Sequence, residues 1–179
     1  GPFLGRTVFQ VNDAKRTFSK LTWRAGIDYD SPLGLVFASV STGYKAGGFN
    51  DGCETGTAPG CALPAAALYY DPETLTAYEA GFKFRISPEF RLNGTVFKYD
   101  YKGLQLSQVA NVCGGPCQVT TNAAVAKVDG VELDAQFQPA DNFQIRMALN
   151  YLDARYDVFI PTPGVDLGGR RFVRKQKWS

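Results

Sequence analysis

The chain has 179 residues, with 19 Lys and Arg against 17 Asp and Glu, so its net charge is close to zero. This length suits one domain of ordinary size, and this charge gives no indication of a nucleic-acid partner. The chain contains no His, which removes the commonest general base and metal ligand. We therefore expect no enzyme activity, no catalytic residues, no cofactor and no metal site.

Six segments alternate apolar and polar residues with a period of two, which is the pattern of β-strands. They cover residues 17–30, 34–45, 74–86, 90–106, 124–138 and 143–157. The connections between them are alternately tight and long, with tight links at 31–33, 87–89 and 139–142. The sequence thus predicts an all-β, antiparallel up-and-down meander whose tight turns all lie at one end, as in an outer-membrane barrel.

Three of the segments separate cleanly into one apolar and one polar face. In the first, Leu21, Trp23, Ala25, Ile27 and Tyr29 share a face. The third and sixth segments repeat this division, with apolar faces around Phe82 and Met147. A soluble sheet with one face on a protein core would also give this pattern. The strand lengths of 12 to 17 residues favour lipid contact, because globular strands usually have about five or six. Tyr and Trp near the segment ends are typical of interfacial aromatic girdles.

The fourth and fifth segments are less regular. A β-bulge near Val96-Phe97 would give the fourth segment one continuous apolar face. In the fifth, Lys127 and Asp129 fall on the apolar side, and they are compatible with a strand end outside the lipid band. For the last turn, opposing Phe137 and Phe143 would place Asp134 opposite Arg146.

Four cysteines form two close pairs, Cys53 with Cys61 and Cys113 with Cys117, all within the long connections. An even count confined to loops favours local disulfides in an oxidising compartment. Free thiols are the next interpretation, and zinc is the least favoured, because the spacings are poor and no His is available.

One further motif does not carry chemistry. The stretch Gly43 to Gly48 has the first glycines of a phosphate-binding loop, but Phe49-Asn50 stands where Lys and Ser or Thr are required, so we interpret it as a strand end running into a loop. No secretory leader is visible at Gly1, and the end at Ser179 resembles the start of another strand. We expect the chain to be an internal piece of a longer protein.

Five stretches of the chain share a further pattern: Arg24–Asp30, Val36–Asn50, Asp71–Lys83, Asn93–Gln105 and Thr121–Leu133. Together they resemble the β-barrel of TonB-dependent outer-membrane receptors. In the third stretch an acidic-Pro-Glu sequence leads into Tyr78-Glu79-Ala80-Gly81-Phe82-Lys83. The resemblance covers about residues 17–157, in the expected order.

The resemblance implies a 22-stranded barrel around an N-terminal plug, which imports ferric siderophores, cobalamin or other scarce nutrients with energy delivered through TonB. Residues 1–179 would then be a barrel segment of six to seven strands, an open sheet in the bacterial outer membrane, without plug or TonB-binding region. Its partners would be outer-membrane lipid, TonB through the missing N-terminal region, and a nutrient, with a ferric siderophore as the leading expectation. The other interpretations are a complete small outer-membrane barrel, as an anchor or adhesin, and a soluble β-sandwich binding module.

The connection lengths also assign sides of the membrane, with loops 46–72, 108–122 and 160–176 outside. Ligand contact is then expected from the outer end of the polar face and from these loops. Aromatic and amide groups there can stack on a chelate or hydrogen-bond to it. The candidate ligand-binding residues are Lys45, Phe49, Tyr69, Tyr70 and Gln105.

Overall fold

The computed structural model describes residues 15–50, 69–111, 116–160 and 164–172 of the chain. Six strands form one antiparallel sheet, in which each strand pairs with the next along the chain. They are β1 (Arg24–Ser31), β2 (Gly34–Lys45), β5 (Glu73–Arg85), β6 (Phe90–Ala110), β7 (Cys117–Ala140) and β8 (Phe143–Phe159). A two-stranded ribbon of β3 (Gly48–Phe49) and β4 (Tyr69–Tyr70) lies beyond β2 and β5. The predicted all-β meander is confirmed.

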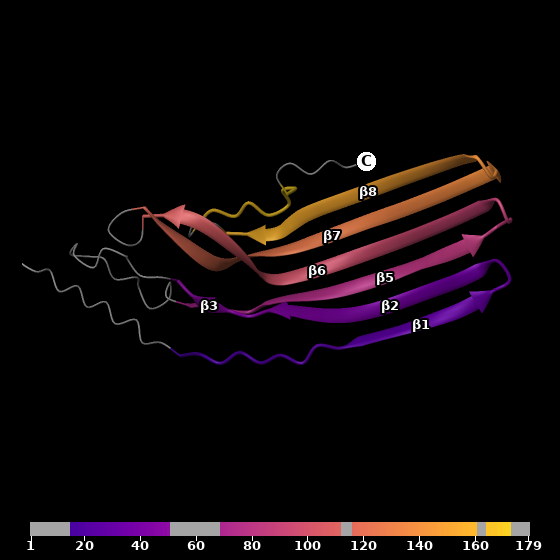
Figure 1. Ribbon diagram of the computed structural model, residues 1–179. Coiled ribbons are helices and arrows are strands. Elements are labelled where there is room, and N and C mark those ends of the chain that lie inside the picture. Colours follow the sequence, from indigo (N-terminus) through magenta and orange to yellow (C-terminus); the bar gives the residue numbers. More distant parts are fainter. Residues whose placement is uncertain (1–14, 51–68, 112–115, 161–163, 173–179) are drawn as a thin grey trace, which may run out of the picture.

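The three tight turns lie together at one end of the sheet, and the strand ends that lead into the long connections lie at the other (Figure 1). At the tight-turn end, the Ser31 hydroxyl donates to the Gly34 carbonyl across the first turn. In the second, the Ser87 hydroxyl accepts from the backbone N–H of Phe90. Gly34 has a positive φ of 135°, a conformation that glycine adopts without the steric cost of a side chain. Local turn chemistry therefore closes this end.

The strand pairing places the apolar alternation of all six strands on one side of the sheet, the apolar face. One row across this face is formed by Ile27, Ala38, Ala80, Val96, Val131 and Tyr151, which are successive pairing partners. We call it the last apolar row, because the next row toward the long connections carries charged residues on three of its six strands. That next row, the boundary row, consists of Ala25, Val40, Tyr78, Lys98, Asp129 and Asp153.

The apolar face is not covered by any second layer of the described chain. Its side chains are open to the surroundings, with Ile27 71% exposed and Met147 68% exposed. The buried apolar residues of the described part are small or medium in size: Ala77, Val119, Ala124, Ala126 and Ala154. No large side chain there is fully buried. A sheet with this much bare apolar surface requires an apolar medium or partner on that face.

The single layer contradicts the β-sandwich interpretation for the described residues, since a sandwich core lies between two facing sheets. The sheet is also open, with β1 and β8 at its edges. At the β8 edge, residue 171 forms an isolated antiparallel bridge with Arg155, and the Phe172 N–H donates to the Ala154 carbonyl. No helix in the described segments is long and apolar enough to cross a membrane.

The bulge near Val96-Phe97, one of two explanations that the sequence left open, does not occur. Pairing between β5 and β6 runs without interruption from Arg85 and Arg91 to Thr74 and Lys102. The irregularity of β6 comes later, between Tyr101 and Gln105, where Gly103 has a φ of 63°. Lys98 and Asp100 therefore remain on the same side of the sheet as Val96. This fits the other explanation, in which charged residues lie on the apolar face beyond the end of the apolar rows.

The predicted pairing at the last turn is also wrong, by two residues. Phe137 opposes Ile145, Gln136 opposes Arg146, and Asp134 opposes Ala148. Asp134 and Arg146 do share the polar face, as expected, but they are not direct partners. The chain reverses at Asp141-Asn142, between the paired residues Ala140 and Phe143. The register shifts between Phe137 and Ala140. Alternation fixes the face of a residue, whereas the turn geometry fixes its partner.

Candidate ligand-contact site at the long-connection end

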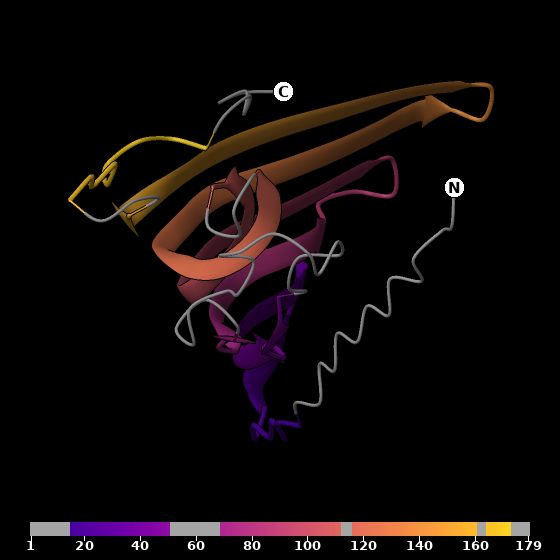
Figure 2. The same cartoon turned by 90° about the vertical axis from the view of Figure 1, so that its left-hand side faces the viewer.

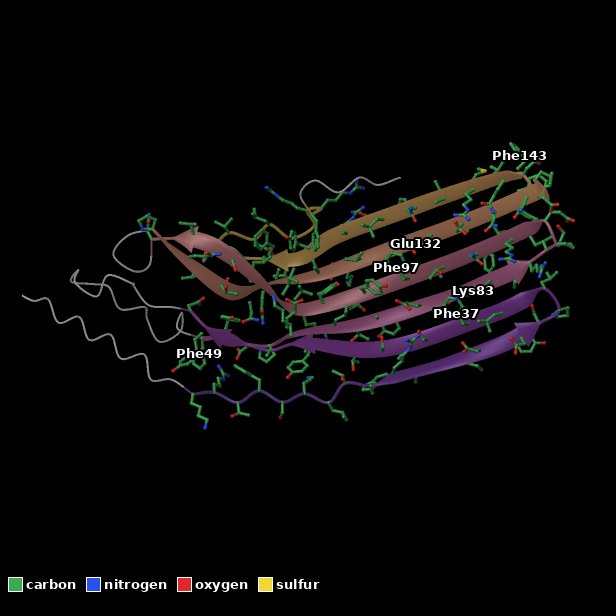
Figure 3. The ribbon with its side chains drawn as sticks, in the orientation of Figure 1. Phe37, Phe49, Lys83, Phe97, Glu132 and Phe143 are labelled. Atoms are coloured by element: carbon green, nitrogen blue, oxygen red, sulfur yellow. The ribbon has the colours of Figure 1, made fainter. Side chains whose placement is uncertain are left out.

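The small ribbon β3–β4 brings three of the five predicted site residues together. Phe49 pairs with Tyr69 and Gly48 with Tyr70. The rings of Phe49 and Tyr69 meet edge to face, with centroids 5.2 Å apart and planes at 64°, an arrangement that aromatic pairs favour. Both side chains remain more than one third exposed. They present a ring surface at the end of the sheet where Figure 3 labels Phe49.

Two glycines allow the close approach that builds this ribbon. A Cβ atom on Gly48 would stand 2.6 Å from Cζ of the Tyr70 ring, and one on Gly47 would stand 2.8 Å from the Phe18 ring. Since real Cβ atoms do not come so near to rings, these positions suit only glycine. Gly47 and Gly48 thus have a packing role, and β2 ends at Lys45 just before them. The interpretation as a strand end running into a loop is confirmed.

Arg16 joins the aromatic group from a segment that precedes β1. Its guanidinium lies 5.1 Å from the Phe18 ring centre and 5.9 Å from that of Tyr69, within the range of cation–π attraction. It also forms an ion pair with Asp71 at 2.9 Å. The side chain of Arg16 is 45% exposed. A cation and several aromatic faces therefore meet at one exposed place.

Gln105 holds the backbone near this group. Its side-chain amide donates to the carbonyls of Ala46, at 2.9 Å, and Asp71, at 3.1 Å. Its backbone N–H donates to the Glu73 carboxylate at 2.9 Å. The amide N–H groups that were expected to face a ligand are thus bound to the two ends of the first long connection. The contacts indicate a framework role for Gln105.

Asn122 on β7 completes this framework. Its amide donates to the carbonyls of Asp71 and Gly103, both at 2.7 Å, and its oxygen accepts the Asp71 N–H at 2.6 Å. Asn50 makes a similar double contact, accepting the Thr120 N–H at 2.7 Å and donating to the Thr120 carbonyl at 2.8 Å. These amides tie the β2–β5 connection to the outer part of β7, which curls together with β6 in Figure 2.

Lys45 is the remaining candidate residue. It is exposed at the end of β2 and opposes Glu73 in the register, and no ion pair involving it occurs in the described part. The structure therefore brings together Phe49, Tyr69 and Tyr70 in the ribbon, and Gln105 binds the two ends of the connection that carries it. Contact of these residues and Lys45 with a ligand stays a prediction.

Sequence reasoning missed Arg16, Phe18, Asp71 and Asn122. Asn122 and Asp71 are 51 residues apart in the chain, and only the curl of β6 and β7 joins them. The motif Asp71-Pro72-Glu73 was noticed as a strand lead, and its acidic residue could have suggested a partner for a cation. Nothing local to Arg16 indicated this role.

The polar face extends from this group along the inside of the sheet. Tyr99 donates to the Glu79 carboxylate at 2.7 Å, and the Phe97 ring covers Gly130 on the next strand. The Lys83 ammonium lies 5.9 Å from the Phe37 ring centre. Figure 3 shows Phe37, Lys83, Phe97 and Glu132 in sequence across β2, β5, β6 and β7. This face mixes rings with charges of both signs.

The predicted disulfides cannot be compared with the structure. Cys53, Cys61 and Cys113 lie outside the described residues, and so does the side chain of Cys117. Among the described residues, no group of three or more His, Cys, Asp or Glu side chains is placed to hold a metal ion.

Comparison with known families matches residues 3–179 to a family described as TonB dependent receptor-like, beta-barrel. The chain belongs to the TonB-dependent receptor β-barrel family. A search of curated proteins found no match. Family members are outer-membrane β-barrels, and the open sheet of six strands accounts for part of such a wall.

Two solved structures share the fold of this TonB-dependent receptor chain. One is the ferric yersiniabactin uptake receptor FyuA from Yersinia pestis, with a TM-score of 0.60, 22% identity, and coverage of 88% of this chain. The other is the copper transporter OprC, with a TM-score of 0.54, 17% identity, and coverage of 74% of this chain. The matches span 21% and 20% of those two chains. The chain thus corresponds to about a fifth of each.

Proposed function

We propose that this chain forms part of the barrel wall of an outer-membrane receptor that imports a scarce nutrient with energy delivered through TonB, and that its cargo is a ferric siderophore. The observation that carries the proposal is the pairing register, which collects bare apolar rows on one face and a charged, ring-bearing surface on the other. Lipid satisfies the first face and a hydrated lumen the second.

The choice of cargo follows from the chemistry of the ring group. Many ferric siderophores are anionic complexes whose ligands include aromatic rings. Arg16 offers a cation, and Phe49 and Tyr69 offer exposed ring faces beside it. Stacking and cation attraction would act together on such a chelate. The two similar structures are a ferric yersiniabactin uptake receptor and a copper transporter, and this supports metal uptake as the broader class.

The test is iron-limited growth of cells with and without the full-length gene, supplied singly with ferric catecholate, phenolate and hydroxamate siderophores. Cobalamin and copper salts form the comparison arms. We expect growth on at least one ferric siderophore to require the gene. If growth depends on the gene only with copper or cobalamin, the siderophore cargo is contradicted and nutrient import is still supported. If growth depends on the gene with none of these nutrients, import itself is contradicted.

A matched pair of variants tests the site itself. Phe49→Ala combined with Tyr69→Ala removes the edge-to-face pair, and we expect uptake at low siderophore concentration to fall about tenfold or more, since buried ring contacts dominate recognition energies. Tyr44→Ala is the control, because Tyr44 is an exposed aromatic residue on the apolar face. Equal uptake by the two variants, at equal surface abundance, would remove the ring group from the proposed site.

A further inference from the structure

The ribbon of β3 and β4 is too short to hold its aromatic residues in place by itself. It consists of two residue pairs, Gly48 with Tyr70 and Phe49 with Tyr69. Even complete two-stranded hairpins are only marginally stable in water. The rings of Phe49 and Tyr69, which we call the ring pair, are also more than one third exposed. Contacts from outside the ribbon are therefore needed to fix its position.

Two asparagine side chains provide such contacts, one at each end of the ribbon. Asn50, the residue after β3, binds both the N–H and the carbonyl of Thr120 on β7, at 2.7 and 2.8 Å. Asn122 on β7 binds both the N–H and the carbonyl of Asp71, the residue after β4, at 2.6 and 2.7 Å. We call the first double contact the outer clasp and the second the inner clasp. Both strands of the ribbon are thus fastened to β7.

Each clasp has the hydrogen bonds of a β-bridge, with a side chain in place of one strand. A carboxamide carries an acceptor oxygen and N–H donors in one plane, so it can bind the N–H and the carbonyl of a single residue. The outer clasp is largely shielded from water, because Asn50 is only 8% exposed. Buried polar groups that lose their hydrogen-bond partner are costly. Replacement of either carboxamide is therefore expected to loosen the ribbon.

The inner clasp is also tied to the irregular part of β6. Gln105 is the direct partner of Asn122 in the register, and its amide donates to the same Asp71 carbonyl at 3.1 Å. Asn122 donates in addition to the Gly103 carbonyl at 2.7 Å. Gly103 has a φ of 63°, and the pairing of β6 and β7 shifts next to it. The irregularity thus lies where two amides converge on Asp71.

The partners of the two clasps on β7 are close together. Thr120 and Asn122 are two residues apart in a regularly paired part of the strand, a rise of about 6.6 Å. Opening of one clasp leaves the ribbon held at one end only, and the ribbon has little stability of its own. The two clasps are therefore expected to open and close together.

We propose that Asn50 and Asn122 are positioning residues for the cargo. Through the two clasps they hold the ribbon and the outer part of β7 as one unit, so that the ring pair is in place before the cargo binds. A contact surface that is ordered in advance lowers the entropic cost of binding. The effect on the cargo rests on the proposed function, whereas the coupling of the two clasps does not.

The first experiment measures hydrogen exchange in the full-length receptor, placed in nanodiscs, by mass spectrometry. Asn50→Asp keeps the acceptor of the outer clasp but removes its donor and sets a carboxylate oxygen against the Thr120 carbonyl. We expect the amide of Asp71, in the other clasp, to exchange about fivefold faster, because the loss of a hydrogen bond shifts an opening equilibrium severalfold. Asn150→Asp on β8 makes the same chemical change away from both clasps and should leave exchange at Asp71 unaltered.

The second experiment measures equilibrium binding and uptake of ferric catecholate, phenolate and hydroxamate siderophores labelled with radioactive iron. We expect Asn122→Asp to raise the Kd of a bound siderophore about tenfold, because the ring pair must then be ordered during binding. The maximal uptake rate should stay unchanged, whereas a merely structural role would lower it through the amount of folded receptor. Asn150→Asp is again the control and should change neither quantity.

A combined variant tests whether the clasp acts through the ring pair. Phe49→Ala with Tyr69→Ala removes the ring pair, and we expect Asn122→Asp to raise the Kd little further in that background. Changes that act through the same contact are not additive, whereas independent changes are.

Three results would overturn the proposal. The first is an unchanged exchange rate at Asp71 in Asn50→Asp, since the clasps would then open independently. The second is an unchanged Kd in Asn122→Asp, and the third is full additivity with loss of the ring pair. If the unaltered receptor binds none of the siderophores, the siderophore cargo and the positioning role are both contradicted. The exchange experiment then still decides whether the two clasps are coupled.

Discussion

The two halves of the apolar face meet the boundary row in different ways. On β1, β2 and β5 that row consists of Ala25, Val40 and Tyr78, whereas on β6, β7 and β8 it consists of Lys98, Asp129 and Asp153. The following row repeats the contrast, with Thr42 and Thr76 beside Asp100, Lys127 and Arg155. At the same distance from the tight turns, one half thus carries aliphatic, aromatic and hydroxyl side chains, and the other half carries ions. Because strands of outer-membrane barrels are tilted by about 35–45°, a row of pairing partners crosses the lipid band obliquely, and its two halves are expected at different depths.

The largest expected effect concerns the apolar rows that both halves share. Leu133→Arg places a charge in the middle of the apolar face and should lower the free energy of unfolding by about 2 to 4 kcal/mol. Asn150→Arg, on the polar face, is the control and should cost much less. Urea unfolding in lipid vesicles measures both. Equal costs would mean that the two faces do not differ in their surroundings.

The line where the two halves meet provides the second prediction. Gly94 on β6 lies between Phe82 and Leu133, and a Cβ there would stand 2.6 Å from the Phe82 ring. Gly94→Ile should destabilise the sheet by about 1 to 3 kcal/mol through overpacking. Gly43→Ile is the matched change, because nothing lies within 4 Å of its Cβ position. If Gly43→Ile shifts the unfolding midpoint as much as Gly94→Ile does, the close packing around Gly94 is contradicted.

The third prediction moves a charge onto the uncharged half of the boundary row. Val40→Lys should cost only about 0 to 1 kcal/mol, because a cation near the membrane interface is far less costly than one at mid-depth. The measurement is again urea unfolding, compared directly with Leu133→Arg. A cost as large as that of Leu133→Arg would place the apolar boundary further along β2 than along β6.

The smallest effect is expected for an ion pair on the charged half. Lys127→Gln removes the ion pair with Asp157, and exposed pairs of this kind contribute little to stability. We expect the difference from the unaltered protein to shrink further at high salt. A loss as large as that of Gly94→Ile would show that this ion pair stabilises the sheet.

Much of the fold could be predicted because a strand with one apolar and one polar side has a sequence that alternates between apolar and polar residues. The series Leu21 to Tyr29 and Phe143 to Tyr151 needed only alternation to assign their sides. The positions of Val96 and Lys98 could not be settled in this way. A change from apolar to charged residues along one face has the same sequence pattern as a bulge, and only the backbone pairing separates the two.

The candidate site was less predictable, because its contacts are made across the curl of β6 and β7. Phe49, Tyr69 and Tyr70 carried a signal as aromatic residues near strand ends, and the structure does group them. Gln105 carried the same kind of signal, yet its amide is bound to the Ala46 and Asp71 carbonyls. Amide side chains satisfy backbone groups as readily as ligands, and sequence alone does not distinguish these uses.

The pairing of Gly48 with Tyr70 and of Phe49 with Tyr69 has a consequence for how such receptors could diversify. Because this pairing closes the base of residues 51–68, insertions and deletions between the two strands need not be transmitted to the register of β2 and β5. The entropic cost of lengthening a loop with fixed ends is small, about 0.6 kcal/mol for each doubling. Residues between β3 and β4 can therefore change in number while β2 and β5 keep their register.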